Sequence, residues 1–171
     1  MPNAPTHDFI TLVTAAGANA AYFTLAPRPD YRLAVLFTAS YVFAGYACAG
    51  DLDLKSTEYK RWGRLRWLWL PYQKLVPHRS WVSHGLLAGG VIRLLYLATV
   101  CTLLFWVGLW VYGRYVSHVN PDAVTRAQWQ SLLSLAHAHP LSTLALVSGF
   151  ILAGTTHTLA DTVFTFCKRR F

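Results

Sequence analysis

The chain has 171 residues, of which 54% are hydrophobic and only 13% are charged. Soluble domains carry about 25% charged residues, so this sequence has too few charges to cover a surface that faces only water. It also has too much apolar surface to bury to be intrinsically disordered. The 15 basic and 7 acidic residues give a net charge of +8, which nucleic acid binding, an anionic lipid surface or membrane topology would each explain. The three cysteines form no CxxC pair and support neither a disulfide framework nor a zinc ribbon.

Four apolar segments are long enough to cross a membrane as helices: residues 9–26, 33–50, 94–113 and 141–160. A helix needs about 20 residues to cross a hydrocarbon core that is ~30 Å thick. Gly and Ala are frequent in three of the segments, and such small residues let membrane helices approach closely. We therefore predict an all-α integral membrane protein that forms a four-helix bundle, with residues 1–171 as a single domain. A soluble all-α bundle is the alternative, which the absence of a polar stripe along these segments disfavours.

The basic residues gather between the second and third apolar segments and at the C-terminus. Residues 51–85 contain seven of them, and Lys168, Arg169 and Arg170 add three more. Four spans would put this loop and both termini on one face, which the positive-inside rule assigns to the cytoplasm. The loop also contains several Trp and Tyr, a mixture that can stack on single-stranded nucleic acid. Beside membrane spans it is more typical of headgroup contact, so we expect membrane lipid as the partner and no nucleic acid. The sequence leaves the oligomeric state open.

Two connecting segments carry no spanning signal. We expect a short interfacial helix near residues 57–69 and then a loop, because Pro71 and Pro77 interrupt a longer helix. The side chains expected there to contact the membrane rather than serve chemistry are Arg61, Arg64 and Arg66. Residues 114–140 would form a loop on the opposite face. The histidines that this topology leaves outside the candidate site are His118, His137 and His139.

Metal-binding residue types recur at the four helix ends that this topology places on the cytoplasmic face. The seven candidate ligands are His7, Asp51, Asp53, His78, His84, His157 and Asp161. His157 and Asp161 are four residues apart and share one helix face, whereas Asp51 and Asp53 can face one site only after the helix has ended, which Gly50 would permit. Each residue alone is more typical of a helix cap, a headgroup contact or a solvated surface. Their convergence from four regions is what predicts a site.

Imidazole and carboxylate together are a ligand set for zinc, manganese or iron. Seven candidates exceed the four ligands of a closed structural zinc site. We therefore expect one or two divalent ions, zinc before manganese or iron, with any excess residues acting as a general base or supporting the ligands. Asp8 is a candidate supporting residue. Arg93, at the start of the third apolar segment, would pair with Asp51 or Asp161, bind an anionic substrate, or extend to the headgroups.

The stretches that carry a family resemblance are Thr6-His7-Asp8, Gly50-Asp51-Leu52-Asp53, Tyr59-Lys60-Arg61-Trp62-Gly63 and His78-Arg79-Ser80-Trp81-Val82-Ser83-His84-Gly85. They resemble the uncharacterised membrane metal-binding proteins grouped as a domain of unknown function, closely over residues 5–96. The late motif from Gly154 to Asp161 is similar to that of the YdjM-type membrane-bound metal-dependent hydrolases, which are themselves similar to zinc-dependent phospholipases C. The sequence departs from the wider pattern at Ala49, where Pro is frequent, and at Gly85, where Ser is expected. The resemblance implies metal ligation by the same seven residues.

These observations favour a metal-dependent hydrolase that acts on an amphiphilic phosphoester at the cytoplasmic interface. The metal would polarise a phosphoryl or acyl oxygen, and Asp53 or Asp161 would accept the proton of the attacking water. Arg79 would hold an anionic oxygen in a bidentate contact, with Arg93 as a second substrate-binding residue. The alternatives are a non-catalytic metal-binding membrane protein, such as a sensor, chaperone or assembly factor, and a purely structural scaffold.

Overall fold

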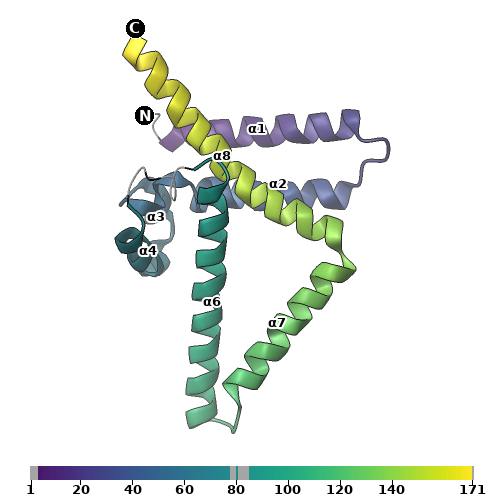
Figure 1. Ribbon diagram of the computed structural model, residues 1–171, viewed down its shortest axis with the longest axis vertical. Helices are drawn as coiled ribbons and strands as arrows, with labels where there is room; N and C mark the ends of the chain where they lie inside the picture. Colours follow the sequence, from purple (N-terminus) through teal and green to yellow (C-terminus); the bar gives the residue numbers. More distant parts are fainter. Residues whose placement is uncertain (1–3, 78–79, 81–84, 171) are drawn as a thin grey trace.

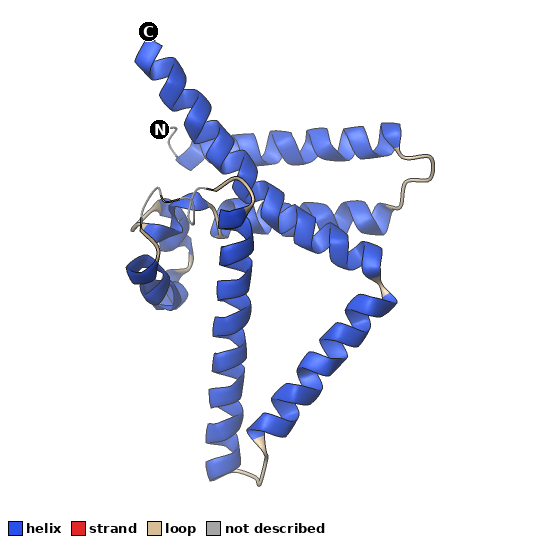
Figure 2. Cartoon of the chain, viewed as in Figure 1, coloured by secondary structure: helices blue, strands red, loops and turns tan. Residues whose placement is uncertain are grey.

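The computed structural model describes residues 4–77, 80 and 85–170, and the regular structure of these residues is all helical (Figure 1, Figure 2). The long helices are α1 (Ala4–Leu25), α2 (Tyr31–Ala47), α6 (Ala88–Tyr115), α7 (Pro121–Ala138) and α8 (Pro140–Arg170). Between α2 and α6 the described residues form four short elements. These are the 3-10 helices η1 (Gly50–Asp53) and η2 (Gly63–Trp69) and the α-helices α3 (Thr57–Arg61) and α4 (Leu70–Leu75). The predicted all-α class is confirmed.

Three stretches of the described chain are long and apolar enough to cross a membrane: Tyr31–Asp53, Ala88–Tyr115 and Pro140–Lys168. They contain three of the four predicted spans and extend beyond them, because a helix continues through polar turns that an apolar window leaves out. The first predicted span, residues 9–26, lies in α1, whose apolar run is diluted by Thr11, Thr14 and Asn19. A helix forms there, but α1 is not among the three stretches of the described chain that are long and apolar enough to cross a membrane.

The long helices form two parts of different packing. α1 and α2 run side by side as an antiparallel hairpin, and α8 crosses them (Figure 1). α6 contacts α8 near its own N-terminus and then leads away, and α7 returns the chain to the start of α8, so that α6, α7 and α8 form the sides of a triangle (Figure 1). α6 therefore does not lie alongside α1 and α2, and the structure does not show a single four-helix bundle.

Close helix crossings depend on glycine. A Cβ on Gly149 of α8 would lie 2.5 Å from the carbonyl oxygen of Phe37 in α2, and a Cβ on Gly90 of α6 would lie 2.9 Å from the Cα of Ile151 in α8. Real Cβ contacts are not this short, so any larger residue would push these helices apart. Small residues at helix crossings are the packing device that membrane helices use most, which agrees with the apolar character of α2, α6 and α8.

The loop predicted at residues 114–140 is wrong over most of its length, because α7 occupies residues 121–138. The helix begins at a strong start signal, since the Asn120 side chain accepts hydrogen bonds from the backbone N–H groups of Asp122 and Ala123 and Pro121 follows the cap. The three histidines that were excluded lie outside the candidate site, in the loop before α7 or at its C-terminal end.

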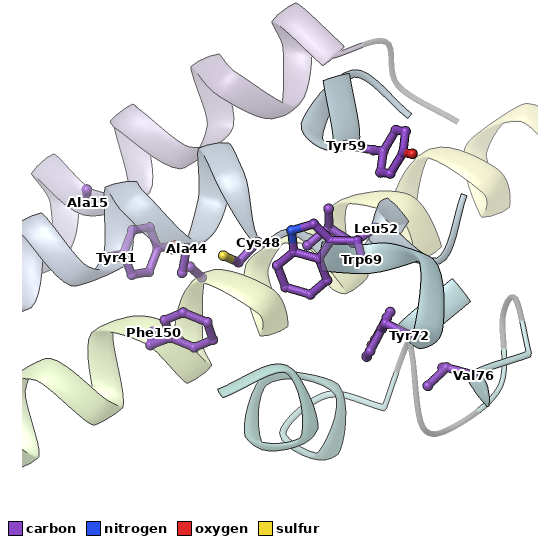
Figure 3. Close-up of a cluster of buried hydrophobic side chains, with 11 residues drawn as sticks. Ala15, Tyr41, Ala44, Cys48, Leu52, Tyr59, Trp69, Tyr72, Val76 and Phe150 are labelled. Atoms are coloured by element: carbon purple, nitrogen blue, oxygen red, sulfur yellow. The ribbon is translucent and has the colours of Figure 1, made fainter. Parts of the chain in front are cut away.

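The basic and aromatic segment is more folded than predicted. Pro71 does not end a helix but stands in the first turn of α4, where its missing N–H costs nothing. Trp69 and Tyr72 are fully buried and pack with Leu52 and Cys48 in the hydrophobic core (Figure 3). The prediction that these aromatic rings lie among lipid headgroups is therefore wrong for Trp69 and Tyr72, although Trp67 is exposed. The segment is anchored to the end of α2 by this core.

Candidate metal centre

The candidate centre lies where the start of α1 meets the second half of α8. His7 is not ahead of the first helix, as predicted, but in the first turn of α1, and His157 and Asp161 lie one turn apart on α8. His7 Nε2 is 3.2 Å from Asp161 Oδ1, and His157 Nε2 is 3.5 Å from Asp161 Oδ2. One ligand atom from each of these three residues lies within 4.8 Å of the others. Three of the seven predicted ligands thus come together.

The three side chains are buried, each with about one twentieth of its surface exposed (5%, 5% and 6%). The two imidazole rings are stacked, with centroids 4.0 Å apart and planes inclined by 22°. Within the described part of the chain, no hydrogen bond reaches His7 Nε2, His157 Nε2 or either carboxylate oxygen of Asp161. Buried polar atoms normally have partners, and each one left without a hydrogen bond costs about 1–3 kcal/mol.

This arrangement fits a metal ion better than it fits a self-contained polar cluster. One atom from each of the two stacked imidazoles and from the carboxylate lies within 4.8 Å of the others, and the described chain gives these atoms no hydrogen bond. A divalent cation between them would satisfy His7 Nε2, His157 Nε2 and both oxygens of Asp161. Imidazole nitrogen with carboxylate oxygen is a donor set that zinc, manganese and iron accept.

Asp51 is the fourth acidic or imidazole group near the centre. It lies in η1, directly after α2, and its Oδ2 is 3.7 Å from His157 Nε2. Its side chain is 21% exposed, in contrast to the three buried groups. The carboxylate of Asp51 therefore lies at the side of the centre that is open to the surroundings.

Asp53 lies in the same short 3-10 helix and is buried beside Tyr72 and Arg93. Burial raises the pKa of the Tyr72 hydroxyl, the Arg93 guanidinium opposes this rise, and the Asp53 carboxylate adds to it. Arg93 is also buried, and its guanidinium occupies the space that a Cβ on Gly154 would need, one turn before His157 on α8. Arg93 therefore faces the protein interior and does not extend to the headgroups.

Three predicted site residues, His78, Arg79 and His84, lie outside the described residues. Their roles as ligands or as a substrate-binding arginine remain predictions from the sequence. The five other predicted ligands lie in three elements, α1, η1 and α8, and the predicted i, i+4 placement of His157 and Asp161 on one face is confirmed by the 3.5 Å distance between them.

The hydrogen bonds below the centre fix α1, α2 and α8 relative to one another. The hydroxyl of Tyr41 in α2 is 2.8 Å from Thr14 Oγ1 in α1 and 2.6 Å from Thr156 Oγ1 in α8. Tyr41 is buried. Because Thr156 directly precedes His157, this three-helix link holds the turn of α8 that carries the centre.

Asp8, the candidate supporting residue, pairs with Arg61. Arg61 does not extend away from the protein, because its two terminal nitrogens donate to the two carboxylate oxygens of Asp8, one over 2.9 Å and one over 2.5 Å. Asp8 follows His7 directly, so Arg61 contacts the segment that carries a candidate ligand. Arg61 therefore has a partner within the protein that composition gave no sign of, and its contact with the membrane stays a prediction from the sequence.

The family model described as "Uncharacterized metal-binding protein (DUF2227)" matches residues 2–171, and the chain belongs to this family. No curated protein and no solved structure matches the chain significantly. The family assignment agrees with the resemblance found in the sequence and with the buried His7, His157 and Asp161 cluster. These comparisons do not show the relation to the YdjM-type hydrolases.

Proposed function

We propose that this protein is a membrane-embedded metal-dependent hydrolase whose substrate is an amphiphilic phosphoester. The centre formed by His7, His157 and Asp161 would hold the divalent cation, with zinc as the first candidate. A second ion would require further ligands from the predicted set. We also propose that the centre and both termini lie on the cytoplasmic side, since the basic residues gather there.

One observation carries the catalytic part of the proposal. Three ligands are buried, while the neighbouring carboxylate of Asp51 is partly exposed. Catalytic zinc sites typically use three protein ligands and keep one position for water or substrate, whereas structural sites are closed by four. Three buried ligands with one open side match the catalytic pattern.

A bound divalent cation would supply an electrophile for a phosphoryl oxygen. The protein would contribute the proton acceptor and the charge that orients the substrate. Asp161 directs both oxygens at the histidines, which favours a ligand role for it and leaves Asp53 as the predicted proton acceptor. Arg93, buried next to the turn of α8 that carries His157, would attract an anionic group by its charge, and Arg79 is the second candidate from the sequence.

A non-catalytic metal-binding protein is the second candidate, and the position of Asp51 favours it. With Oδ2 only 3.7 Å from His157 Nε2, Asp51 needs a small displacement to become a fourth ligand. A centre of two histidines and two aspartates would be closed, as in a structural or sensing site.

Asp51→Asn distinguishes the two functions. Protein purified in detergent is reconstituted with Zn²⁺, its metal content is measured by elemental analysis, and hydrolysis is followed with a panel of phospholipids. For an enzyme, the wild type hydrolyses at least one phospholipid and Asp51→Asn retains its metal. For a closed site, Asp51→Asn loses metal, because removing a ligand weakens binding outright, and neither protein hydrolyses any phospholipid. Absence of bound metal from the folded wild type would contradict both.

A further inference from the structure

Arg61 contacts two other helices at once, α1 and α2. From the last residue of α3, its guanidinium binds both carboxylate oxygens of Asp8 in α1 and also donates to the carbonyl oxygen of Tyr46 in α2 over 2.9 Å. Its guanidinium carbon lies 5.0 Å from the centroid of the Tyr46 ring. The hydrogen bonds to Asp8 raise the pKa of Arg61 further above its ordinary value. A two-pronged arginine–carboxylate contact fixes direction as well as distance.

The contact to Tyr46 satisfies the end of a helix. The last four carbonyl groups of an α-helix lack partners within the helix, and Tyr46 and Ala47 are the last two residues of α2. Arg61 donates to the carbonyl of Tyr46, and the indole of the next residue, Trp62, donates to the carbonyl of Ala47 over 2.7 Å. These two side chains attach α3 to the end of α2.

Of the two helices that Arg61 holds, α1 carries a group of the candidate centre and α2 leads directly to another. Asp8 follows His7, and η1 with Asp51 begins three residues after Ala47. The first turn of a helix has unsatisfied N–H groups and frays easily, and His7 lies in that turn of α1. Without Arg61, the described contact that joins Asp8 to α2 and α3 would be lost, and His7 would depend on its packing against α8.

We propose that Asp8 and Arg61 are a positioning pair that holds His7, and through the end of α2 also Asp51, at the geometry required for metal binding. This inference rests on the proposed metal centre. The two side chains are 20% and 29% exposed, so water screens the pair only in part. Partners that orient ligands in this way typically change metal affinity 10–100-fold when they are removed.

The test measures the Zn²⁺ affinity of the full chain in detergent by competition with a chromophoric chelator. Arg61→Gln and Asp8→Asn should each weaken Zn²⁺ binding by about 10-fold, and the double variant should be no weaker than either single variant, because the same contact is lost in all three. Arg61→Lys keeps the positive charge but cannot bind both carboxylate oxygens in a planar bidentate contact, so its Zn²⁺ affinity should lie between those of the wild type and Arg61→Gln. Arg64→Gln is the matched control, since Arg64 is an exposed arginine three residues further on, and it should bind Zn²⁺ as the wild type does.

Thermal unfolding in the presence of a chelator separates positioning from stability. If Arg61→Gln lowers the melting temperature but leaves the Zn²⁺ affinity within two-fold of the wild type, the pair has only a structural role and the inference is overturned. Additive losses in the double variant would also overturn it. The variant His157→Ala distinguishes loss of the positioning role from an error in the assignment of the metal centre itself. Zn²⁺ binding that depends on His157 but not on Arg61 refutes only the positioning role, whereas binding that depends on neither refutes the centre.

Discussion

Removing the metal should destabilise this protein by an amount that the geometry of the centre sets. Four buried atoms, namely His7 Nε2, His157 Nε2 and the two oxygens of Asp161, have no hydrogen bond within the described chain. At the lower cost of about 1 kcal/mol for each unsatisfied buried atom, the metal-free centre carries a penalty of about 4 kcal/mol. A cation that binds all four atoms removes this penalty.

Binding linkage sets the metal concentration at which a stabilisation of this size is reached. A ligand that binds only the folded state stabilises it by about 4.1 kcal/mol when present at 1,000 times its dissociation constant. For a chain of this length each kcal/mol shifts the melting temperature by roughly 2–4 °C. We therefore expect saturating Zn²⁺ to raise the melting temperature of chelator-treated protein by roughly 8–16 °C.

The assay is thermal unfolding in detergent, with and without Zn²⁺, for the wild type, His157→Ala and His118→Ala. His157→Ala should lose most of the Zn²⁺-dependent rise, because His157 contacts Asp161, stacks on His7 and faces Asp51. His118→Ala should retain it, and it controls for metal that binds any surface histidine. An equal rise in all three proteins would refute the assignment of the centre to this cluster.

Two further predictions concern the membrane part. The first uses single cysteines introduced at Lys60 and Arg126 in a chain whose three native cysteines are replaced. If α6 spans the bilayer, the two cysteines should react with an impermeant reagent from opposite sides of the membrane. Reaction from the same side would rule out a span between them. Gly149→Val should destabilise the protein by about 1–3 kcal/mol, because its Cβ would lie 2.5 Å from the Phe37 carbonyl oxygen, whereas Gly17→Ala, with open space around it, should unfold at or above the wild-type temperature. Equal losses in the two glycine variants would show that this crossing tolerates larger residues.

The sequence predicted the parts of the centre that depend on short-range periodicity and on the order of the helices. Four residues separate His157 from Asp161, so any helix through them places both on one face. The alternation of predicted spans placed His7 at the same end of the protein as His157 and Asp161, and His7 does meet α8. The four-helix bundle from which this placement was predicted does not form, because α6 does not pack alongside the other helices. The placement of His157 and Asp161 depends only on the helix that carries them, and the 3.5 Å distance between their side chains confirms it.

The sequence did not predict which way individual polar and aromatic residues face. Arg61 and Arg64 lie three residues apart in a basic stretch and both are exposed, yet Arg61 also binds Asp8. Trp67 and Trp69 differ in burial, since only Trp69 enters the core. Composition alone cannot distinguish such neighbours, because burial is decided by contacts from other elements. For α7, in contrast, the sequence did contain a helix start signal at Asn120 and Pro121. The prediction of a loop over residues 114–140 did not take this signal into account.

The length of α8 bears on which substrate can reach the centre. The predicted fourth span ended near Asp161, but the helix continues to Arg170, and Val163, Phe164 and Phe166 in this extension are exposed. Full burial of such a side chain is worth about 1.5–3 kcal/mol, so lipid around this apolar extension would stabilise it more than water does. If α8 spans the bilayer as far as Lys168, seven residues at 1.5 Å per residue put Asp161 about 10 Å along the helix from that residue. A centre at that level would be reached more readily from the lipid phase than from water, in line with the proposed amphiphilic substrate.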